Sequence, residues 1–330
     1  MKPFTLLSSL SHQLFKISND KEFNKIALEV FRFQYKNISI YRNYVNFNNI
    51  SVKDINHYTK IPFLPIEFYK THNIVKDLKK VEKTFLSSGT TRSKRSKHHV
   101  LKLDIYKKSF LKEFVNNYGD PKDWIILGLL PSYIEQGDSS LIYMVDQLMG
   151  LSENKQSKYI DLKWAQSSSN LSKLKGEKVM LFGVSYALLD LAENKLPSLS
   201  NWTIIETGGM KGRKKEITRA ELHQKLKTAF DVQEIHSEYG MSELLSQAYS
   251  KKDGVFSSPK WMKIIIRDLA DPFQIIHNNL TGGINIIDLA NIYSCSFIET
   301  QDIGKKYNGK FEVLGRTDNS EIRGCNLLTI

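Results

Sequence analysis

Hydrophobic and polar positions along the chain predict buried strands alternating with amphipathic helices in its middle part. The apolar run at residues 124–130 stops at Pro131, and a second run at residues 178–182 is followed by Gly183 and a helical segment. Continuous apolar runs of this length are typical of strands buried on both faces of a parallel sheet. We therefore expect a mainly parallel α/β arrangement there.

Two helices in this part are predicted by their end signals. One is expected between Asp104, which could cap it, and Gly119, where it would end. Its apolar stripe comprises Tyr106, Phe110 and Phe114. The other is expected to begin at Thr218, which can form a capping box with Glu221. Its apolar stripe comprises Leu222, Leu226 and Phe230.

The two ends of the chain follow different patterns. Residues 1–80 are mostly helical in pattern, and the two prolines of segment 61–70 favour an extended, partly buried stretch there. From about residue 260, short strands alternate with turns rich in Gly, Asn and Asp. The expected fold class is α/β: a large, mainly parallel sheet layered with helices, plus a β-rich C-terminal part. We expect a helical lead-in at 1–80, packed on a main domain at 81–330.

Composition indicates a globular chain, because 41% of its residues are hydrophobic and 25% are charged. The formal net charge of +12 suits a polyanionic partner, which could be a nucleotide, a nucleic acid or an anionic membrane surface. The longest apolar region, 179–192, is shorter than the ~20 residues that span a bilayer. The two cysteines have no metal-ligand spacing and form no disulfide framework. We expect a cytoplasmic protein without a transmembrane segment.

The segment LSSGTTRSKRSKHH, residues 86–99, has the composition of a phosphate-binding loop. Such a loop needs small residues that let backbone N–H groups close on the anion, hydroxyl donors, and a nearby cation. The small and hydroxyl-bearing residues are Ser87, Ser88, Gly89, Thr90 and Thr91. The candidate cations are Lys94, Arg95 and Lys97. A solvated basic turn has the same composition, and the second Gly of a Walker A loop is missing, so composition alone leaves both interpretations open.

The order of these residues resembles the phosphate loop of the acyl-adenylate-forming enzymes, which include acyl-CoA synthetases, firefly-type luciferases and peptide-synthetase adenylation domains. The fuller pattern, SSGTT followed by SKH at 96–98, is similar to the LuxE-type acyl-protein synthetases. Arg92 stands where much of the superfamily has Gly. Further segments resemble the superfamily in the expected order: ETGGMKGRKKEIT (206–218), EYGMSE (238–243), ETQDIG (299–304) and GRTDNSEIRGCNL (315–327).

The resemblance implies a role for each of these segments, although each alone could be an ordinary turn. Gly208 and Gly209 would lie against the adenine, because close backbone approach to a flat base needs the absence of a Cβ. Tyr239 would also lie near the base, and Gly240 beside it would belong to the nucleotide site. Ser242 would hydrogen-bond the phosphate region, and Glu243 would hold Mg²⁺, a hard cation that prefers oxygen ligands.

The C-terminal segments complete the implied nucleotide site. Asp302 would accept hydrogen bonds from the ribose hydroxyls, although Gln301 replaces the family's Gly beside it. Arg316 would contact the ribose or the phosphate, and Asp318 would be the hinge pivot. We expect the segments that carry Gly89, Glu243, Asp302 and Arg316 to converge on one AMP-sized cleft.

The activity that the resemblance implies is activation of a fatty or other carboxylic acid with ATP and Mg²⁺, followed by acyl transfer to a protein thiol. Lys97 and Arg316 would neutralise charge in the transition state. Cys325 stands in the place of the family's acyl-accepting thiol, and Arg323 nearby would favour its thiolate. Cys295 lies in an apolar run and is expected in the core. Acyl-reductase or acyl-transferase subunits are the expected partners.

One departure from the superfamily leaves alternatives open. The sequence ends at Ile330, soon after the hinge-like segment, whereas most members continue into a lid domain with a catalytic lysine. We therefore expect a short or missing lid, an adenylation step that is slower or differently organised, or a truncated sequence. An acyl- or aryl-CoA ligase and an inactive homologue acting as a complex subunit are the alternatives. A nucleic-acid partner is not expected, because no recognisable nucleic-acid module is present.

Overall fold

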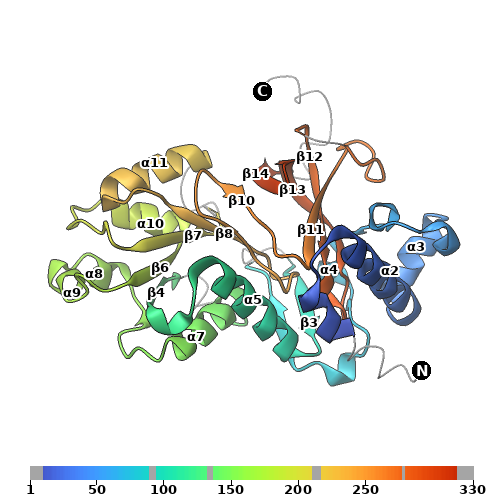
Figure 1. Ribbon diagram of the computed structural model, residues 1–330, viewed down its shortest axis with the longest axis horizontal. Coiled ribbons are helices and arrows are strands. Elements are labelled where there is room, and N and C mark those ends of the chain that lie inside the picture. Colours follow the sequence, from blue (N-terminus) through green and yellow to red (C-terminus); the bar gives the residue numbers. More distant parts are fainter. Residues whose placement is uncertain (1–9, 89–93, 132–136, 210–216, 277–278, 318–330) are drawn as a thin grey trace. The chain divides into compact units, whose positions relative to one another are not determined.

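The computed structural model describes residues 10–88, 94–131, 137–209, 217–276 and 279–317. Contacts within the chain define two compact units. We call Val81–Pro259 the central unit, and Met1–Lys80 together with Lys260–Ile330 the terminal unit. The elements of both are labelled in Figure 1.

The central unit is built on a largely parallel sheet. Its strands are β4 (Ile125–Leu129), β5 (Lys158–Tyr159), β6 (Val179–Val184), β7 (Thr203–Thr207), β8 (His236–Tyr239) and β9 (Ala248–Ser250). They follow the order β5-β4-β6-β7-β8-β9, and each neighbouring pair is parallel except β8 with β9. Every residue of β4 and β6 is buried, which confirms the strands predicted from continuous apolar runs.

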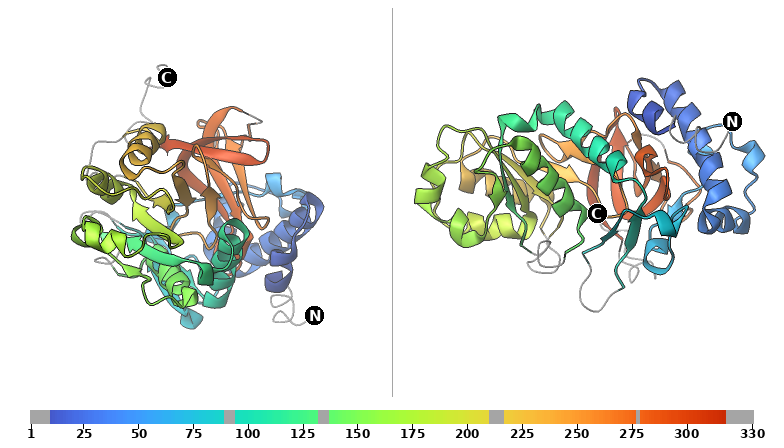
Figure 2. Two further views of the ribbon diagram at one scale, coloured as in Figure 1. Left: turned by 60° about the vertical axis from the view of Figure 1, so that its left-hand side comes forward. Right: turned by 90° about the horizontal axis from the view of Figure 1, so that it is seen from below.

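Helices cover both faces of this sheet. They are α5 (Leu103–Tyr118), α7 (Ser140–Ser152), α8 (Leu162–Ala165), α9 (Ser168–Ser172), α10 (Ser185–Ala192) and α11 (Arg219–Phe230). Figures 1 and 2 show α5 and α7 on one side and α10 and α11 on the other. The predicted capping box is confirmed: the Thr218 hydroxyl accepts from the Glu221 amide, and the Glu221 carboxylate accepts from the Thr218 amide.

The predicted cap of α5 is wrong. Lys102 occupies the N-cap position, and Asp104 lies inside the first turn. The amide of Leu103 donates instead to the carboxylate of Glu82, at 2.8 Å. A side chain distant in sequence thus satisfies an N–H group that a local cap would otherwise serve. The predicted end is confirmed, because Gly119 is the C-cap with φ +82°.

A β-hairpin and a short strand complete the central unit. The hairpin consists of β2 (Lys83–Leu86) paired antiparallel with β3 (Lys97–Val100). Phe85 of β2 is fully buried against the rings of Tyr106 and Tyr143. The short strand β10 (Val255–Phe256) precedes Ser257, which forms a bridge with Tyr249 of β9.

The terminal unit is β-rich with helices on its sheet. Its strands are β1 (Leu64–Pro65), β11 (Met262–Arg267), β12 (Thr281–Asp288), β13 (Phe297–Tyr307) and β14 (Lys310–Arg316). Strands β11 to β14 pair antiparallel in sequence order, and β1 adds in parallel to β13. Its helices are α2 (Asp20–Asn37), α3 (Ser39–Phe47) and α4 (Phe68–Thr71). The rings of Phe31 and Tyr41 pack on Phe297 of β13, which joins α2 and α3 to the sheet.

Single-turn helices lie between these elements. They are η1 (Leu14–Lys16), η2 (Val52–Asp54), η3 (Tyr58–Lys60), η4 (Leu78–Lys80), η5 (Pro121–Asp123) and η6 (Leu289–Asn291). The segment predicted to be extended at 61–70 contains β1, although α4 begins at Phe68. Cys295 is fully buried, as its apolar surroundings predict.

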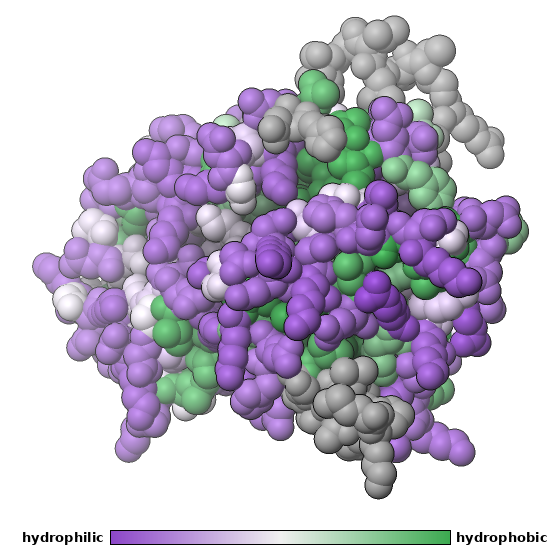
Figure 3. All heavy atoms as spheres, turned by 45° about the vertical axis from the view of Figure 1, so that its right-hand side comes forward, coloured by the Kyte–Doolittle hydropathy of each residue, from purple (hydrophilic) through white to green (hydrophobic). Residues whose placement is uncertain are grey.

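The polarity of the surface is that of a globular protein, as the composition of the chain predicts. Figure 3 shows a face on which hydrophilic side chains predominate. Large apolar side chains that are exposed include Phe47, Phe273, Leu280 and Leu314. Within the ranges described above, no helix combines the length and the apolar character that crossing a membrane requires.

Candidate functional site

Two turns of the candidate site follow neighbouring strands of the central sheet. Strands β7 and β8 are parallel, with Thr207 opposite Glu238. The predicted glycine turn, Gly208 and Gly209, and the predicted turn at 239–243 therefore leave the same edge of the sheet. This edge is the carboxyl end of the strands, where ligands bind in open α/β sheets.

Two of the three glycines at this edge, Gly208 and Gly240, have a structural reason to lack a side chain. Gly208 has φ +66°, in the left-handed region that side chains disfavour. A Cβ on Gly240 would lie 2.5 Å from Oε1 of Glu238, whereas a Cβ on Gly209 would meet nothing within 4 Å. Gly208 and Gly240 thus shape the two turns, and Gly209 leaves its backbone open to approach.

The hairpin that bears the predicted phosphate loop is tied to the second turn. Oγ of Ser242 donates to the carbonyl of Leu86 at 3.3 Å, and Nδ1 of His98 lies 2.8 Å from the carbonyl of Ser242. The hairpin is closed at Ser87, whose amide donates to Ser96 O at 3.1 Å and whose Oγ accepts from the Ser96 amide at 2.9 Å. The structure therefore brings together the ends of three predicted segments within the central unit.

The remaining predicted residues of this unit occupy distinct positions around these turns. Ser88 follows Ser87 directly, and Lys97 is exposed on β3 opposite Leu86. Tyr239 ends β8, with its ring 5.8 Å from that of Phe256. Glu243 is buried, with 5% of its surface exposed.

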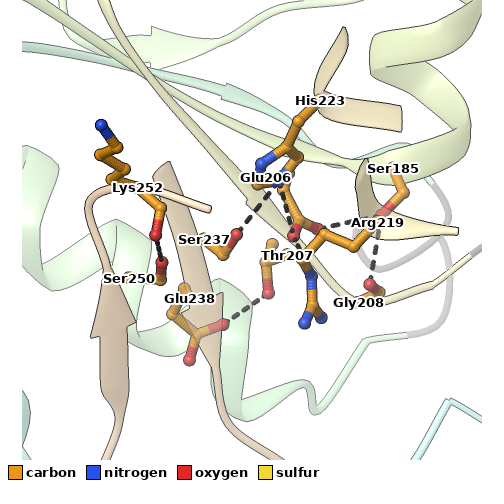
Figure 4. Close-up of polar contacts among 10 residues, drawn as sticks. All are labelled: Ser185, Glu206, Thr207, Gly208, Arg219, His223, Ser237, Glu238, Ser250 and Lys252. Atoms are coloured by element: carbon orange, nitrogen blue, oxygen red, sulfur yellow. Dashed lines mark hydrogen bonds and ion pairs between the residues drawn. The ribbon is translucent and has the colours of Figure 1, made fainter. Parts of the chain in front are cut away.

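A buried ionic network supports the glycine turn (Figure 4). Glu206, 2% exposed, lies 3.1 Å from Nε of Arg219 and 3.5 Å from Nε2 of His223, both on α11. Oγ of Ser185, at the start of α10, lies 3.2 Å from Oε2 of Glu206 and 3.2 Å from the carbonyl of Gly208, so one hydroxyl proton serves both acceptors. Burial alone would raise the pKa of Glu206, but the His223 hydrogen bond and the Arg219 charge hold it below its ordinary value.

The adjoining carboxyl group, Glu238, has the opposite electrostatic character. Burial raises the pKa of Glu238 to about 7, the charge of Glu206 adds to the rise, and a hydrogen bond from Thr207 opposes it. Between pH 4.5 and about 7, Glu206 is therefore ionised while Glu238 is protonated.

Asp302 and Arg316 belong to the terminal unit and face each other there. They are partners in the β13–β14 register, with Arg316 Nε 3.9 Å from Asp302 Oδ1. A second nitrogen of Arg316 donates to the Gln301 side chain at 3.1 Å. The predicted residues Gly89, Thr90, Thr91, Asp318 and Cys325 lie outside the described residues.

Sequence reasoning assigned no role to the network around Glu206. The one local signal was a charged residue between an apolar strand and a glycine pair, in the letters ETGG. Its partners come from α10 and α11, and their convergence depends on the tertiary fold.

Among the described residues, no group of three or more His, Cys, Asp or Glu side chains could hold a metal ion.

Comparison with solved structures identifies the fold. An open conformation of 2-hydroxyisobutyryl-CoA ligase (HCL), in complex with 2-HIB-AMP and CoA, matches with a TM-score of 0.67 at 10% identity, over 91% of this chain and 71% of that one. The same ligase in the postadenylation state with 2-HIB-AMP gives a TM-score of 0.66 at 12% identity, over 91% and 68%. MatB from Rhodopseudomonas palustris with ATP bound gives 0.52 at 15% identity, over 73% and 49%, so the chain spans about half of MatB.

These likenesses confirm the predicted fold class, the N-terminal domain of the adenylate-forming fold with a β-rich C-terminal part. No known family model matches the sequence, and no curated protein matches it either.

Proposed function

We propose that this protein activates a carboxylic acid with ATP, releases pyrophosphate, and transfers the acyl group from the adenylate to a thiol. The observation that carries the proposal is the joining of three segments at the carboxyl edge of the central sheet. These segments are the end of β2, the glycine turn after β7 and the turn after β8. The fold shared with a ligase solved with 2-HIB-AMP supports the same chemistry.

The chemistry requires alignment and charge neutralisation. A carboxylate oxygen bonds to the α-phosphorus of ATP, the bond from that phosphorus to the bridging oxygen breaks, and pyrophosphate leaves with the bond's electron pair. We assign phosphate binding to Ser87, Ser88, Gly89, Thr90 and Thr91, with Ser242. Lys97 and Arg316 would stabilise the developing charge, which preorganised donors do effectively in a site shielded from water.

The nucleoside half of ATP needs flat and polar contacts. We assign the base to Gly208, Gly209, Tyr239 and Gly240, and the ribose hydroxyls to Asp302. The exposed Gly208, Gly209 and Gly240 fit this assignment, because backbone free of side chains can approach a ring closely.

Mg²⁺ fits the donor set through Glu243. Mg²⁺ is commonly held by one or two carboxylates together with substrate phosphates rather than by an all-protein cage. A buried carboxylate that follows a residue tied to the phosphate-loop hairpin suits this mode. Bound there, Mg²⁺ would neutralise phosphate charge, and Glu243 would fix its place.

We propose a protein thiol, Cys325, as the acyl acceptor, and a fatty acid as the substrate class, as in the LuxE-type enzymes. In that case acyl-reductase or acyl-transferase subunits would take the acyl group onward. CoA is the second candidate acceptor, and the CoA complex of HCL favours it.

The test is acid-dependent exchange of labelled pyrophosphate into ATP, with a panel of fatty, aromatic and short hydroxy acids. Exchange with at least one acid is expected, and its absence with all of them would refute the proposal and favour an inactive homologue. Intact mass after incubation then separates the acceptors. An acyl adduct lost in Cys325→Ser supports the protein thiol, whereas free acyl-CoA formed equally by both proteins supports CoA.

A further inference from the structure

His98 is a buried residue that connects two parts of the proposed site across a long sequence distance. Its side chain is fully buried on β3, and its Nδ1 lies 2.8 Å from the carbonyl of Ser242. A carbonyl oxygen can only accept a hydrogen bond, so Nδ1 carries the proton. The ring therefore holds the backbone of the residue that directly precedes Glu243.

The same turn is held by the other strand of the hairpin. Oγ of Ser242 donates to the carbonyl of Leu86, the last residue of β2. Phe85 pairs with His98 and Leu86 pairs with Lys97, so the two anchors lie on neighbouring rungs. Ser242 is thus held through its side chain from β2 and through its backbone from β3.

We infer that His98 is a positioning residue that sets the Glu243 carboxylate at a fixed separation from the phosphate-loop hairpin, and so couples Mg²⁺ to the binding of ATP phosphates. The inference rests on the proposed function. Hairpin and turn lie far apart in the sequence, and the two hydrogen bonds on Ser242 link them directly. A binding site for a metal-bound phosphate needs its groups held within a fraction of an ångström, which such links provide.

His99 offers a matched control within the same strand. It is also buried, and its Nδ1 lies 2.9 Å from Oγ1 of Thr84 across the hairpin. Replacement of either ring removes a buried imidazole together with the hydrogen bond at its Nδ1. The His98 hydrogen bond reaches the turn that carries Glu243, whereas the His99 hydrogen bond to Thr84 stays within the hairpin.

The experiment measures ATP binding by titration calorimetry, once in excess Mg²⁺ and once in EDTA. The proteins compared are wild type, His98→Leu, His98→Asn, His98→Gln and His99→Leu. His98→Leu is expected to weaken binding in Mg²⁺ about tenfold, the effect of losing one buried hydrogen bond, with a smaller change in EDTA. His98→Asn places an N–H near the position of Nδ1 and is expected to regain most of the affinity. His98→Gln places its amide further out and should not. Melting temperatures without nucleotide report the purely structural effect.

The outcomes separate the two proposals. Equal losses in His98→Leu and His99→Leu, an equal loss in Mg²⁺ and in EDTA, or the absence of rescue by Asn would overturn the positioning role. Should His98→Leu fail to fold, the comparison of Asn with Gln decides alone, and equal affinities overturn the inference. A wild type that binds ATP with Mg²⁺ but exchanges no pyrophosphate refutes acid activation, while the variants still test the coupling. A wild type that does not bind ATP overturns both.

Discussion

Replacement of Glu238 by Gln should make the protein's stability less dependent on pH. Glu238 is 8% exposed at the end of β8 and accepts a hydrogen bond from Thr207. Burial raises its pKa from 4.5 to about 7. Gln keeps an acceptor oxygen for Thr207 at nearly the same volume, but it cannot ionise.

The magnitude follows from the difference between the folded and unfolded pKa values. A rise from 4.5 to about 7 is roughly 2.5 units, and each unit corresponds to 1.36 kcal/mol, so the full effect is about 3 kcal/mol. Between these pH values the folded protein keeps the proton that the unfolded chain has released. The contribution of protonated Glu238 to the free energy of unfolding is therefore complete below pH 4.5, declines as pH rises, and is lost above pH 7. The free energy of unfolding of Glu238→Gln minus that of wild type should rise by about 3 kcal/mol from pH 4.5 to pH 8.

The assay is urea unfolding of both proteins at several pH values, followed by tryptophan fluorescence. Glu234→Gln is the control, because a hydrogen bond from Lys227 lowers the pKa of Glu234 and moves its titration below this range. Its difference from wild type should stay constant from pH 5 to pH 8. A constant difference for Glu238→Gln as well would refute the reasoning and mean that Glu238 is ionised throughout.

Three further predictions concern the helix cap, the buried network and the terminal unit. Thr218→Ala should lower the free energy of unfolding by about 1 kcal/mol in urea unfolding, because it removes a capping box, whereas Thr228→Ala later in α11 should cost clearly less. Glu206→Gln should lower it by about 3 kcal/mol, because it breaks a buried ion pair. Asp302→Ala and Arg316→Ala should each raise KM for ATP about tenfold in pyrophosphate exchange and leave KM for the acid unchanged.

Each of these has an outcome that contradicts it. Equal decreases in the free energy of unfolding for Thr218→Ala and Thr228→Ala would mean that the capping box contributes no more than an ordinary threonine hydroxyl in the helix. A Glu206→Gln protein as stable as wild type would show that the carboxylate's partners do not depend on its charge. A rise in both KM values would assign Asp302 and Arg316 to general stability instead of the nucleotide.

Features of the fold that depend on neighbouring residues could be predicted from the sequence. Strands β4 and β6 can be recognised in the sequence as apolar runs because both of their faces are buried. The capping box of α11 needs only Thr218 and Glu221, three residues apart. The cap of α5 could not be predicted in this way, because Glu82 reaches the helix from outside its own segment.

Some residues of the candidate site could likewise be predicted from the sequence, and others could not. Its glycines and turn residues follow strand ends directly, so short motifs reveal them. His98 and Ser242 are 144 positions apart, and Glu206 is reached from α10 and α11. No periodicity or spacing encodes such pairs, since they form only when the sheet places its strand ends side by side.

The charges at the carboxyl edge of the central sheet favour a polyanionic ligand more than the presence of two glutamates there suggests. Two glutamates, Glu206 and Glu238, are the next-to-last residues of adjacent strands there, and two full negative charges would repel a phosphate. The charge of Glu206 is offset by Arg219 at 3.1 Å. That of Glu238 is suppressed below pH 7, because burial and the neighbouring Glu206 both raise its pKa. The proton on Glu238 therefore removes one negative charge from the edge where ATP is proposed to bind, and Glu238→Gln, which mimics the protonated form, should bind ATP at least as tightly as wild type at pH 8.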